Sequence, residues 1–126
     1  MPVSGLAPYD DSNVFARILK GEIPCRKVFE DNHVLAFHDI NPLSPVHVLV
    51  IPKARYVSFA DFAARAGEAE IAGFFRAVGE VTRRLGLEAK GYRLLTNMGA
   101  DANQEIPHFH LHIFAGRPLG RMLAPA

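Results

Sequence analysis

Apolar residues recur along this chain with two different periods, which predict strands in some segments and helices in others. Five short runs alternate between apolar and polar positions or are rich in β-branched and aromatic residues, as is typical of strands. Turn-forming residues separate them, such as Asp31 and Asn32 between the first two runs. The predicted strands are residues 27–30, 34–38, 46–51, 92–97 and 108–114.

Two other segments have helical spacing. Residues 14–20 predict a short helix that Ser12 or Asn13 caps and Gly21 ends. From about residue 61 to residue 85, apolar residues recur every three or four positions, which predicts one long helix. The apolar residues at this spacing are Ile71, Phe74, Phe75, Val78 and Leu85.

The order of these segments predicts an α+β fold with one short and one long helix. Short loops join most of the strands, so we expect a largely antiparallel five-stranded sheet with the long helix on one face. Residues 1–12 are expected to be a flexible tail, and residues 13–126 a single domain. From about residue 115 the chain is rich in glycine and proline and predicts an irregular C-terminal tail.

Composition excludes several classes of protein. Hydrophobic residues make up 49% of the 126 residues, which argues against general disorder. The net charge of +1 and the lack of a basic run argue against binding of duplex nucleic acid. No run is long and apolar enough to predict a membrane helix, and no signal peptide is evident. The single cysteine, Cys25, fits a cytoplasmic location.

Half of the six histidines fall within five residues, His108-Phe109-His110-Leu111-His112. Residues two apart in a strand share a face, so the three imidazoles are expected to point one way. The outer two are about 13 Å apart along a strand, so one target atom cannot contact all three. Histidine offers a neutral, nucleophilic nitrogen at neutral pH. The pattern therefore predicts attack by His110 on a phosphoryl group, with the flanking histidines in support.

Two other interpretations stay open at this point. His108 and His110 could bind a transition metal, with His47 or a carboxylate such as Asp39 or Glu105 completing the site. Alternatively, the three histidines could be polar residues on a solvent-facing strand.

The run His108-Phe109-His110-Leu111-His112-Ile113-Phe114 matches the signature of the histidine triad (HIT) family of nucleotide hydrolases and transferases. The chain also resembles this family at Gly21-Glu22-Ile23-Pro24, at residues 35–40, at residues 45–53 and at Gly91-Tyr92-Arg93-Leu94. The resemblance covers roughly residues 13–118 and is closest to the Hint branch, the purine nucleoside phosphoramidases.

This resemblance implies a HIT-like fold and a homodimer that joins two sheets into one of ten strands. It also implies hydrolysis of a purine nucleoside phosphoramidate through a covalent nucleotidyl-histidine on His110. A purine nucleotide such as AMP or GMP is the implied ligand, and neither a cofactor nor a metal is required. The alternatives are a dinucleoside polyphosphate hydrolase and a nucleotide-binding regulatory protein with little catalysis.

The resemblance assigns roles to particular residues. His110 matches the nucleophile, and the backbone carbonyl of His108 would hold its other ring nitrogen. His112 and His47 match histidines close to the phosphate. The nucleotide-contacting positions are the ribose acceptor Asp39, the neighbouring His38, the amides Asn97 and Gln104, Ile106, and an apolar slot for the base formed by Val14, Phe15, Ile18, Ile23, Phe37 and Ile40.

One position departs from the Hint pattern. Glu105 stands where that branch usually has a serine that helps to protonate the leaving group. A carboxylic acid could donate a proton, whereas a carboxylate would repel the phosphate. The sequence therefore leaves the leaving group open. The tail after Pro118 also departs from the branch.

Overall fold

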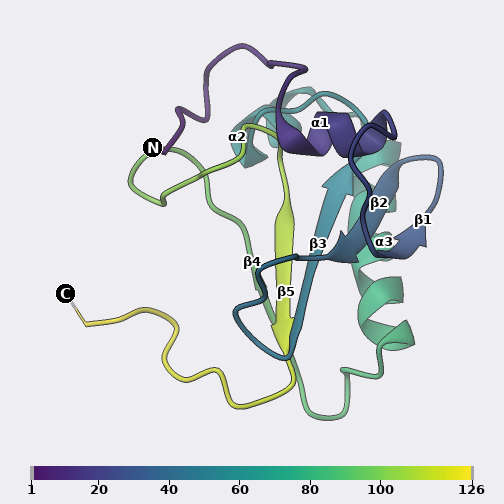
Figure 1. Ribbon diagram of the computed structural model, residues 1–126, viewed down its shortest axis with the longest axis vertical. Helices are drawn as coiled ribbons and strands as arrows, with labels where there is room; N and C mark the ends of the chain where they lie inside the picture. Colours follow the sequence, from purple (N-terminus) through teal and green to yellow (C-terminus); the bar gives the residue numbers. More distant parts are fainter. Residues whose placement is uncertain (1, 126) are drawn as a thin grey trace.

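The five-stranded antiparallel sheet predicted from the alternating runs is present in the computed structural model, which describes residues 2–125 (Figure 1). Its strands lie in the order β1-β2-β3-β5-β4, so the two central strands of the site, β3 and β5, are neighbours. The bounds are β1 (Lys27–Glu30), β2 (Val34–His38), β3 (Val46–Pro52), β4 (Arg93–Leu95) and β5 (Leu111–Ala115).

Side chains at alternate positions of the strands pack on opposite faces of the sheet and form two separate hydrophobic cores. Val48 and Val50 of β3 pack with Phe74 and Val78 on the face covered by the long helix. Leu49, between them, packs on the opposite face with Phe15 of the first helix. The period-two pattern of the strands therefore places side chains from the same strands in two separate layers.

The predicted long helix is in fact two helices. The helices are α1 (Val14–Leu19), α2 (Phe59–Arg65) and α3 (Glu68–Arg84). Ala66 and Gly67 have extended backbone, with ψ angles of 143° and 163°, and this separates α2 from α3. Glycine is a poor helix former and tolerates this position. Within α3, Phe74, Ala77, Val78 and Val81 are buried.

Phe75, one of the apolar residues that indicated the helix, lies off the buried face of α3 and is 46% exposed. It follows Phe74 directly, and a step of one residue turns the side chain by about 100° around the helix axis. The short helix α1 begins as predicted, because the Asn13 side chain accepts a hydrogen bond from the Ala16 N–H.

The last strand begins at Leu111 and not at His108 as predicted. Its partners β3 and β4 pair with residues 111–115 only, and the preceding backbone bonds elsewhere. The Phe109 N–H donates to the Tyr56 carbonyl at 2.7 Å. The alternation of side chains nevertheless continues, since Phe109, Leu111 and Ile113 all lie in the core on the α3 side of the sheet.

The segment before α1 has defined contacts with the rest of the domain. The Val3 N–H donates to the Gln104 carbonyl at 2.8 Å, and the Ser58 hydroxyl donates to the Gly5 carbonyl at 2.6 Å. These contacts bring residues predicted as a tail close to the histidine run. At the other end, residues 116–125 contain neither helix nor strand. Within residues 2–125, no helix combines the length and apolar character needed to span a bilayer.

Candidate active site

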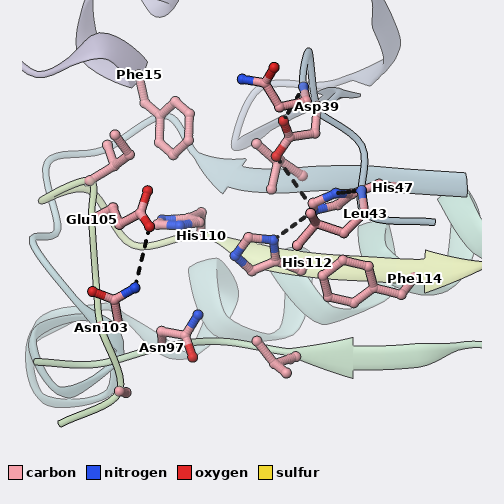
Figure 2. Close-up of a pocket in the computed structure, with 15 residues that line it drawn as sticks. Phe15, Asp39, Leu43, His47, Asn97, Asn103, Glu105, His110, His112 and Phe114 are labelled. Carbon is pink, nitrogen blue, oxygen red and sulfur yellow. Dashed lines mark hydrogen bonds and ion pairs between the residues drawn. The ribbon is translucent and has the colours of Figure 1, made fainter. Parts of the chain in front are cut away.

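A cavity of about 510 Å³ opens on the face of the sheet opposite α3 (Figure 2). Phe15 of α1 forms one wall, and β3, β4 and β5 form the floor. Two loops, around residues 39–43 and 97–106, form the remaining sides. The lining residues are Phe15, Asp39, Asn41, Leu43, His47, Leu49, Leu95, Asn97, Ala102, Asn103, Glu105, Ile106, His110, His112 and Phe114.

His110 is held so that one ring nitrogen remains available. Its Nδ1 lies 2.6 Å from the backbone carbonyl oxygen of His108, and a carbonyl can only accept, so Nδ1 carries the proton. Burial lowers the pKa of His110, which keeps the ring neutral. Nε2 therefore has a lone pair. No buried side-chain nitrogen or oxygen among the described residues lacks a hydrogen-bond partner, so the unbonded Nε2 is open to the cavity.

His108 is buried behind His110 and does not line the cavity. Its Nε2 lies 2.8 Å from the Pro52 carbonyl oxygen and must donate to it. Nδ1 then accepts a hydrogen bond from the Tyr9 hydroxyl at 2.5 Å. Burial lowers the pKa of His108 to about 4. Both ring nitrogens are occupied, so the side chain fixes the backbone carbonyl that orients His110.

His47 and His112 form a hydrogen-bonded pair on neighbouring strands. The Leu43 N–H donates to His47 Nδ1 at 3.1 Å, so the proton of the neutral His47 ring is on Nε2. That Nε2 donates to His112 Nδ1 at 2.9 Å. His112 therefore carries its own proton on Nε2. Burial, followed by the neighbouring His110 and His47, lowers the pKa of His112 to about 3. The pair thus presents an N–H donor without a positive charge.

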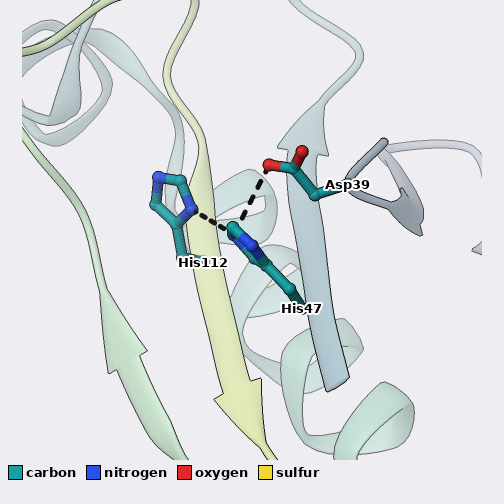
Figure 3. A group of neighbouring side chains, drawn as sticks. All are labelled: Asp39, His47 and His112. Carbon is teal, nitrogen blue, oxygen red and sulfur yellow. Dashed lines mark hydrogen bonds and ion pairs between the residues drawn. The ribbon is translucent and has the colours of Figure 1, made fainter. Parts of the chain in front are cut away.

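Asp39 stabilises a turn with one carboxylate oxygen and contacts the His47–His112 pair with the other. Its Oδ1 accepts from the Asn41 N–H at 2.8 Å, and its Oδ2 lies 3.5 Å from His47 Nε2. Figure 3 shows the carboxylate and the two imidazoles converging, and their ligand atoms lie within 4.8 Å of one another. These three residues could hold a metal ion. The pair His108 and His110 considered from the sequence could not, because both His108 nitrogens are occupied.

The loop before the histidine run carries Asn103 and Glu105 to the cavity. Figure 2 shows them on one side of His110, with His112 and His47 on the other. Asn103 Nδ2 donates to Glu105 Oε1 at 3.3 Å. Gln104 between them points inward and is 1% exposed. Its amide oxygen accepts from Gly99 N–H, and its amide nitrogen donates to the carbonyls of Val57 and Ile106.

The structure brings half of the residues predicted for the site to the cavity wall. These are Phe15, Asp39, His47, Asn97, Glu105, Ile106, His110 and His112. The others are not among the lining residues. His108 and Gln104 are buried behind the lining, and Val14, Ile18 and Phe37 belong to the apolar layer around Phe15, whereas Ile23, His38 and Ile40 belong to neither group. Ile40 is 85% exposed, and of the six residues expected to form the apolar slot only Phe15 lines the cavity.

Several lining residues were not expected from the sequence. Leu49 follows His47 by two positions and Phe114 follows His112 by two, so the alternation of the strands is the signal that would have found them. Leu43 and Asn103 lie in loops. Asn103 has a φ of 58°, a left-handed conformation that asparagine tolerates better than most residues. No periodicity predicts where such loop side chains point.

This site, with the hydrogen-bonded His47 and His112 on neighbouring strands and His110 just before β5, occurs in a chain that matches a known family. The model of the HIT domain matches residues 20–119. The chain belongs to the HIT domain family. An uncharacterised HIT-like protein of Azospirillum brasilense is 67% identical over 115 residues, covering 91% of this chain and 94% of that protein.

Other members of the HIT domain family have descriptive names or solved structures. The purine nucleoside phosphoramidase of Escherichia coli K12 is 35% identical over 114 residues, covering 90% of this chain and 95% of that enzyme. The structure of a HIT family hydrolase from Clostridium thermocellum superposes with a TM-score of 0.79 at 36% identity, covering 90% of this chain and 99% of that one. The family and fold inferred from the sequence are therefore confirmed.

Proposed function

We propose that this HIT domain protein hydrolyses purine nucleoside phosphoramidates through a covalent nucleotidyl-histidine on His110. The observation that carries the proposal is the 2.6 Å hydrogen bond from His110 Nδ1 to the His108 carbonyl. It fixes the tautomer with its lone pair on Nε2, at the cavity. The name of the E. coli relative, purine nucleoside phosphoramidase, supports the same substrate class.

The reaction begins with attack of His110 Nε2 on phosphorus. A nitrogen–phosphorus bond forms to His110, and the bond between phosphorus and the leaving amine breaks. Its electron pair goes to the amine, which takes up a proton from water. A second water then attacks phosphorus, so that a phosphorus–oxygen bond forms and the bond to His110 Nε2 breaks with its electron pair returning to the ring. The proton of this water neutralises the hydroxide left in the first step, and the nucleoside monophosphate is released. Phosphoryl transfer needs hydrogen-bond donors for the developing charge, and His112 Nε2–H and the Asn97 amide supply them.

The remaining lining residues suit a nucleoside. Apolar residues with a few polar groups are typical of such pockets, and Phe15, Leu49 and Ile106 offer an apolar wall for a purine base. Asp39 Oδ2 would accept from the ribose hydroxyls, since Oδ1 is already used in the turn. AMP and GMP are the expected products. The mechanism routes no step through a metal.

A dinucleoside polyphosphate is the second candidate substrate within the family, and a regulatory nucleotide-binding role is the third. The described lining contains two carboxylates and no lysine or arginine, which disfavours the highly charged polyphosphate. The accessible lone pair on His110 favours catalysis over binding alone.

The test compares hydrolysis of adenosine 5′-phosphoramidate by the wild type, His110→Ala and His33→Ala. His33 is an exposed histidine in the turn before β2, so it controls for loss of an imidazole elsewhere. We expect His110→Ala to lose at least about a thousandfold in kcat and His33→Ala to match the wild type. Equal rates for wild type and His110→Ala would refute the nucleophile.

We also propose that the protein is a cytoplasmic homodimer with a ten-stranded sheet. The strand β4 is at the edge of the sheet, and Leu94 on it is 43% exposed, so an edge is available for pairing with a second copy. Sedimentation equilibrium tests this, with a dimer expected at micromolar concentration and a monomer contradicting the proposal.

A further inference from the structure

The cavity around His110 carries an excess of negative charge. Among its 15 lining residues, Asp39 and Glu105 are the charged ones, and neither lysine nor arginine is present. The three imidazoles do not offset these carboxylates, because each keeps one nitrogen without a proton. His47 Nδ1 accepts from the Leu43 N–H, His112 Nδ1 accepts from His47 Nε2, and the His110 proton is on Nδ1. Neutral N–H donors therefore face the phosphate, and no positive charge faces the rest of the substrate.

The charge of Glu105 is not compensated by a cation within residues 2–125. Its carboxylate accepts only from the neutral Asn103 amide, and no salt bridge to it is formed by the described lysine and arginine side chains. Glu105 is also exposed, so its carboxylate faces the solvent-accessible part of the cavity. An unpaired carboxylate at a binding site attracts a cation and repels an anion.

The two carboxylates have different places around the nucleophile. Asp39 belongs to the side of His47, where one of its oxygens is fixed by a turn. Glu105 lies on the opposite side of His110 in Figure 2, beside Asn103. If Asp39 accepts from the ribose, as in the proposed function, Glu105 is the carboxylate left to face the other substituent on phosphorus, which is the leaving group.

We infer that this enzyme prefers phosphoramidates whose leaving amine bears a second, positively charged group, such as a short diamine. This inference rests on the proposed function and restricts its substrates to phosphoramidates with a cationic leaving amine. The second ammonium group, two or three carbons from the scissile nitrogen, would lie against Glu105. A leaving group with its own carboxylate would be selected against by the same charge.

The size of this charge preference depends on the distance between Glu105 and the ammonium group and on how strongly the solvent screens their attraction. Two unit charges about 6 Å apart at a partly exposed site interact by an amount that corresponds to roughly a 3- to 100-fold change in rate or affinity. We therefore expect about a tenfold preference for a cationic over a neutral leaving group, and a comparable discrimination against an anionic one. Added salt should weaken both, because it screens exposed charges.

The experiment uses three adenosine 5′-phosphoramidates with leaving groups of similar size. These are the amidates of 1,3-diaminopropane, n-butylamine and β-alanine, which are cationic, neutral and anionic. For each, kcat/KM is measured with the wild type, Glu105→Gln and Glu88→Gln. Glu88 is an exposed glutamate outside the cavity, so its variant is the matched control for loss of one negative charge.

We expect the order cationic, neutral, anionic for the wild type and for Glu88→Gln, and a spread compressed to less than about twofold per step in Glu105→Gln. Equal kcat/KM for the three amidates in the wild type would overturn the inference. An unchanged order in Glu105→Gln would overturn it as well, because the discrimination would come from another group.

A second measurement keeps this inference separate from the proposed reaction. The dissociation constants of the three amidates are measured by calorimetry with His110→Ala, which cannot form the covalent intermediate. The same order of affinities is expected whether or not the wild type hydrolyses them. Absence of turnover with the expected order of affinities would refute the proposed function alone. Turnover with equal rates and equal affinities would refute the charge preference alone.

Discussion

The hydroxyl of Tyr9 donates a hydrogen bond to His108 Nδ1 at 2.5 Å, across 99 positions of the sequence. His108 Nε2 donates to the Pro52 carbonyl, and the His108 carbonyl accepts from His110 Nδ1. A residue in the N-terminal segment is therefore linked to His110 through one fully buried imidazole. The Arg55 guanidinium stacks over the Tyr9 ring at 5.0 Å and holds it from the other side.

The substitution Tyr9→Phe should slow the reaction more than it weakens substrate binding. It removes the hydroxyl and leaves a buried nitrogen of His108 without a partner, which costs about 1–3 kcal/mol in the free energy of unfolding. Because His108 also fixes the carbonyl that orients His110, we expect kcat to fall by about 3- to 10-fold with KM little changed. Steady-state kinetics and urea unfolding measure both effects.

The matched control is Tyr92→Phe, since Tyr92 is 38% exposed and lies just before β4. Its stability and kcat should match those of the wild type. If Tyr9→Phe lost stability but kept the wild-type kcat, Tyr9 would be a structural residue only, and the link to His110 would be wrong.

A substitution at Gln104 can distinguish two roles for this residue. The sequence led us to expect a contact with phosphate, whereas in the structure its amide holds backbone groups of the surrounding loops. The Gln104 amide bonds to three backbone groups and is buried beneath the loop that carries Glu105. Gln104→Leu should therefore lower the free energy of unfolding by about 2–3 kcal/mol, since those buried groups lose their partners. Urea denaturation measures this change.

Asn97→Ala is the comparison, because Asn97 lines the cavity and is not part of the hydrogen bonds that hold Gln104 in place. It should change stability by no more than about 0.5 kcal/mol while lowering kcat. A stable Gln104→Leu variant with impaired substrate binding would instead support a direct contact between Gln104 and phosphate.

The sequence predicted the layers of the fold better than the walls of the cavity. The alternation of Val48, Leu49 and Val50 predicts which side chains face each side of the sheet, because a strand has a fixed period of two residues. The same rule correctly places Phe109 opposite His108 and His110, although the strand itself begins only at Leu111. Local geometry of this kind is encoded over a few residues.

No periodic pattern in the sequence predicts where loop side chains point or which residues far apart in the chain contact each other. Gln104 and Glu105 are adjacent in a turn-rich segment, yet one is buried and the other exposed. The contact between Tyr9 and His108 depends on how the N-terminal segment crosses the sheet, which neither composition nor periodicity indicates. The helical spacing over residues 61–85 likewise does not indicate a break, and only the extended backbone at Ala66 and Gly67 shows that one helix ends and another starts there.

The buried histidines make stability depend on pH in a predictable direction. The folded pKa of His108 is about 4 and that of His112 about 3, both lowered mainly by burial from an ordinary value of 6.5. In the window between the folded and unfolded pKa values, the unfolded chain binds more protons. The stabilisation is therefore fully present above about pH 6.5 and is lost as the pH falls toward 4.

His108 alone should account for about 3 kcal/mol of this loss between pH 7 and pH 4, because its side chain is fully buried. Urea unfolding at pH 7, 6 and 5 measures the slope. His108→Asn should reduce the slope, whereas His33→Ala should leave it as in the wild type. A free energy of unfolding that stays constant or rises on acidification would contradict the assignment of neutral, buried imidazoles.

Removal of metal ions should leave the reaction intact. His47 and His112 already share a proton at 2.9 Å, and the mechanism uses them as neutral hydrogen-bond donors and acceptors. We expect the same kcat before and after dialysis against EDTA. Added zinc should inhibit, because it would displace that proton and bind Asp39, His47 and His112 together. Loss of activity on chelation, with recovery on addition of zinc, would contradict the mechanism.

The central claim is that His110 Nε2 forms a bond to phosphorus. Rapid quenching of the wild type with adenosine 5′-phosphoramidate, followed by mass spectrometry of peptides at neutral to alkaline pH, tests it most directly. The account predicts an adenylyl group on the peptide containing residues 108–112, at His110, which is absent from His110→Ala and retained in His33→Ala. Hydrolysis without any adenylylated histidine, or with the group on another residue, would contradict it.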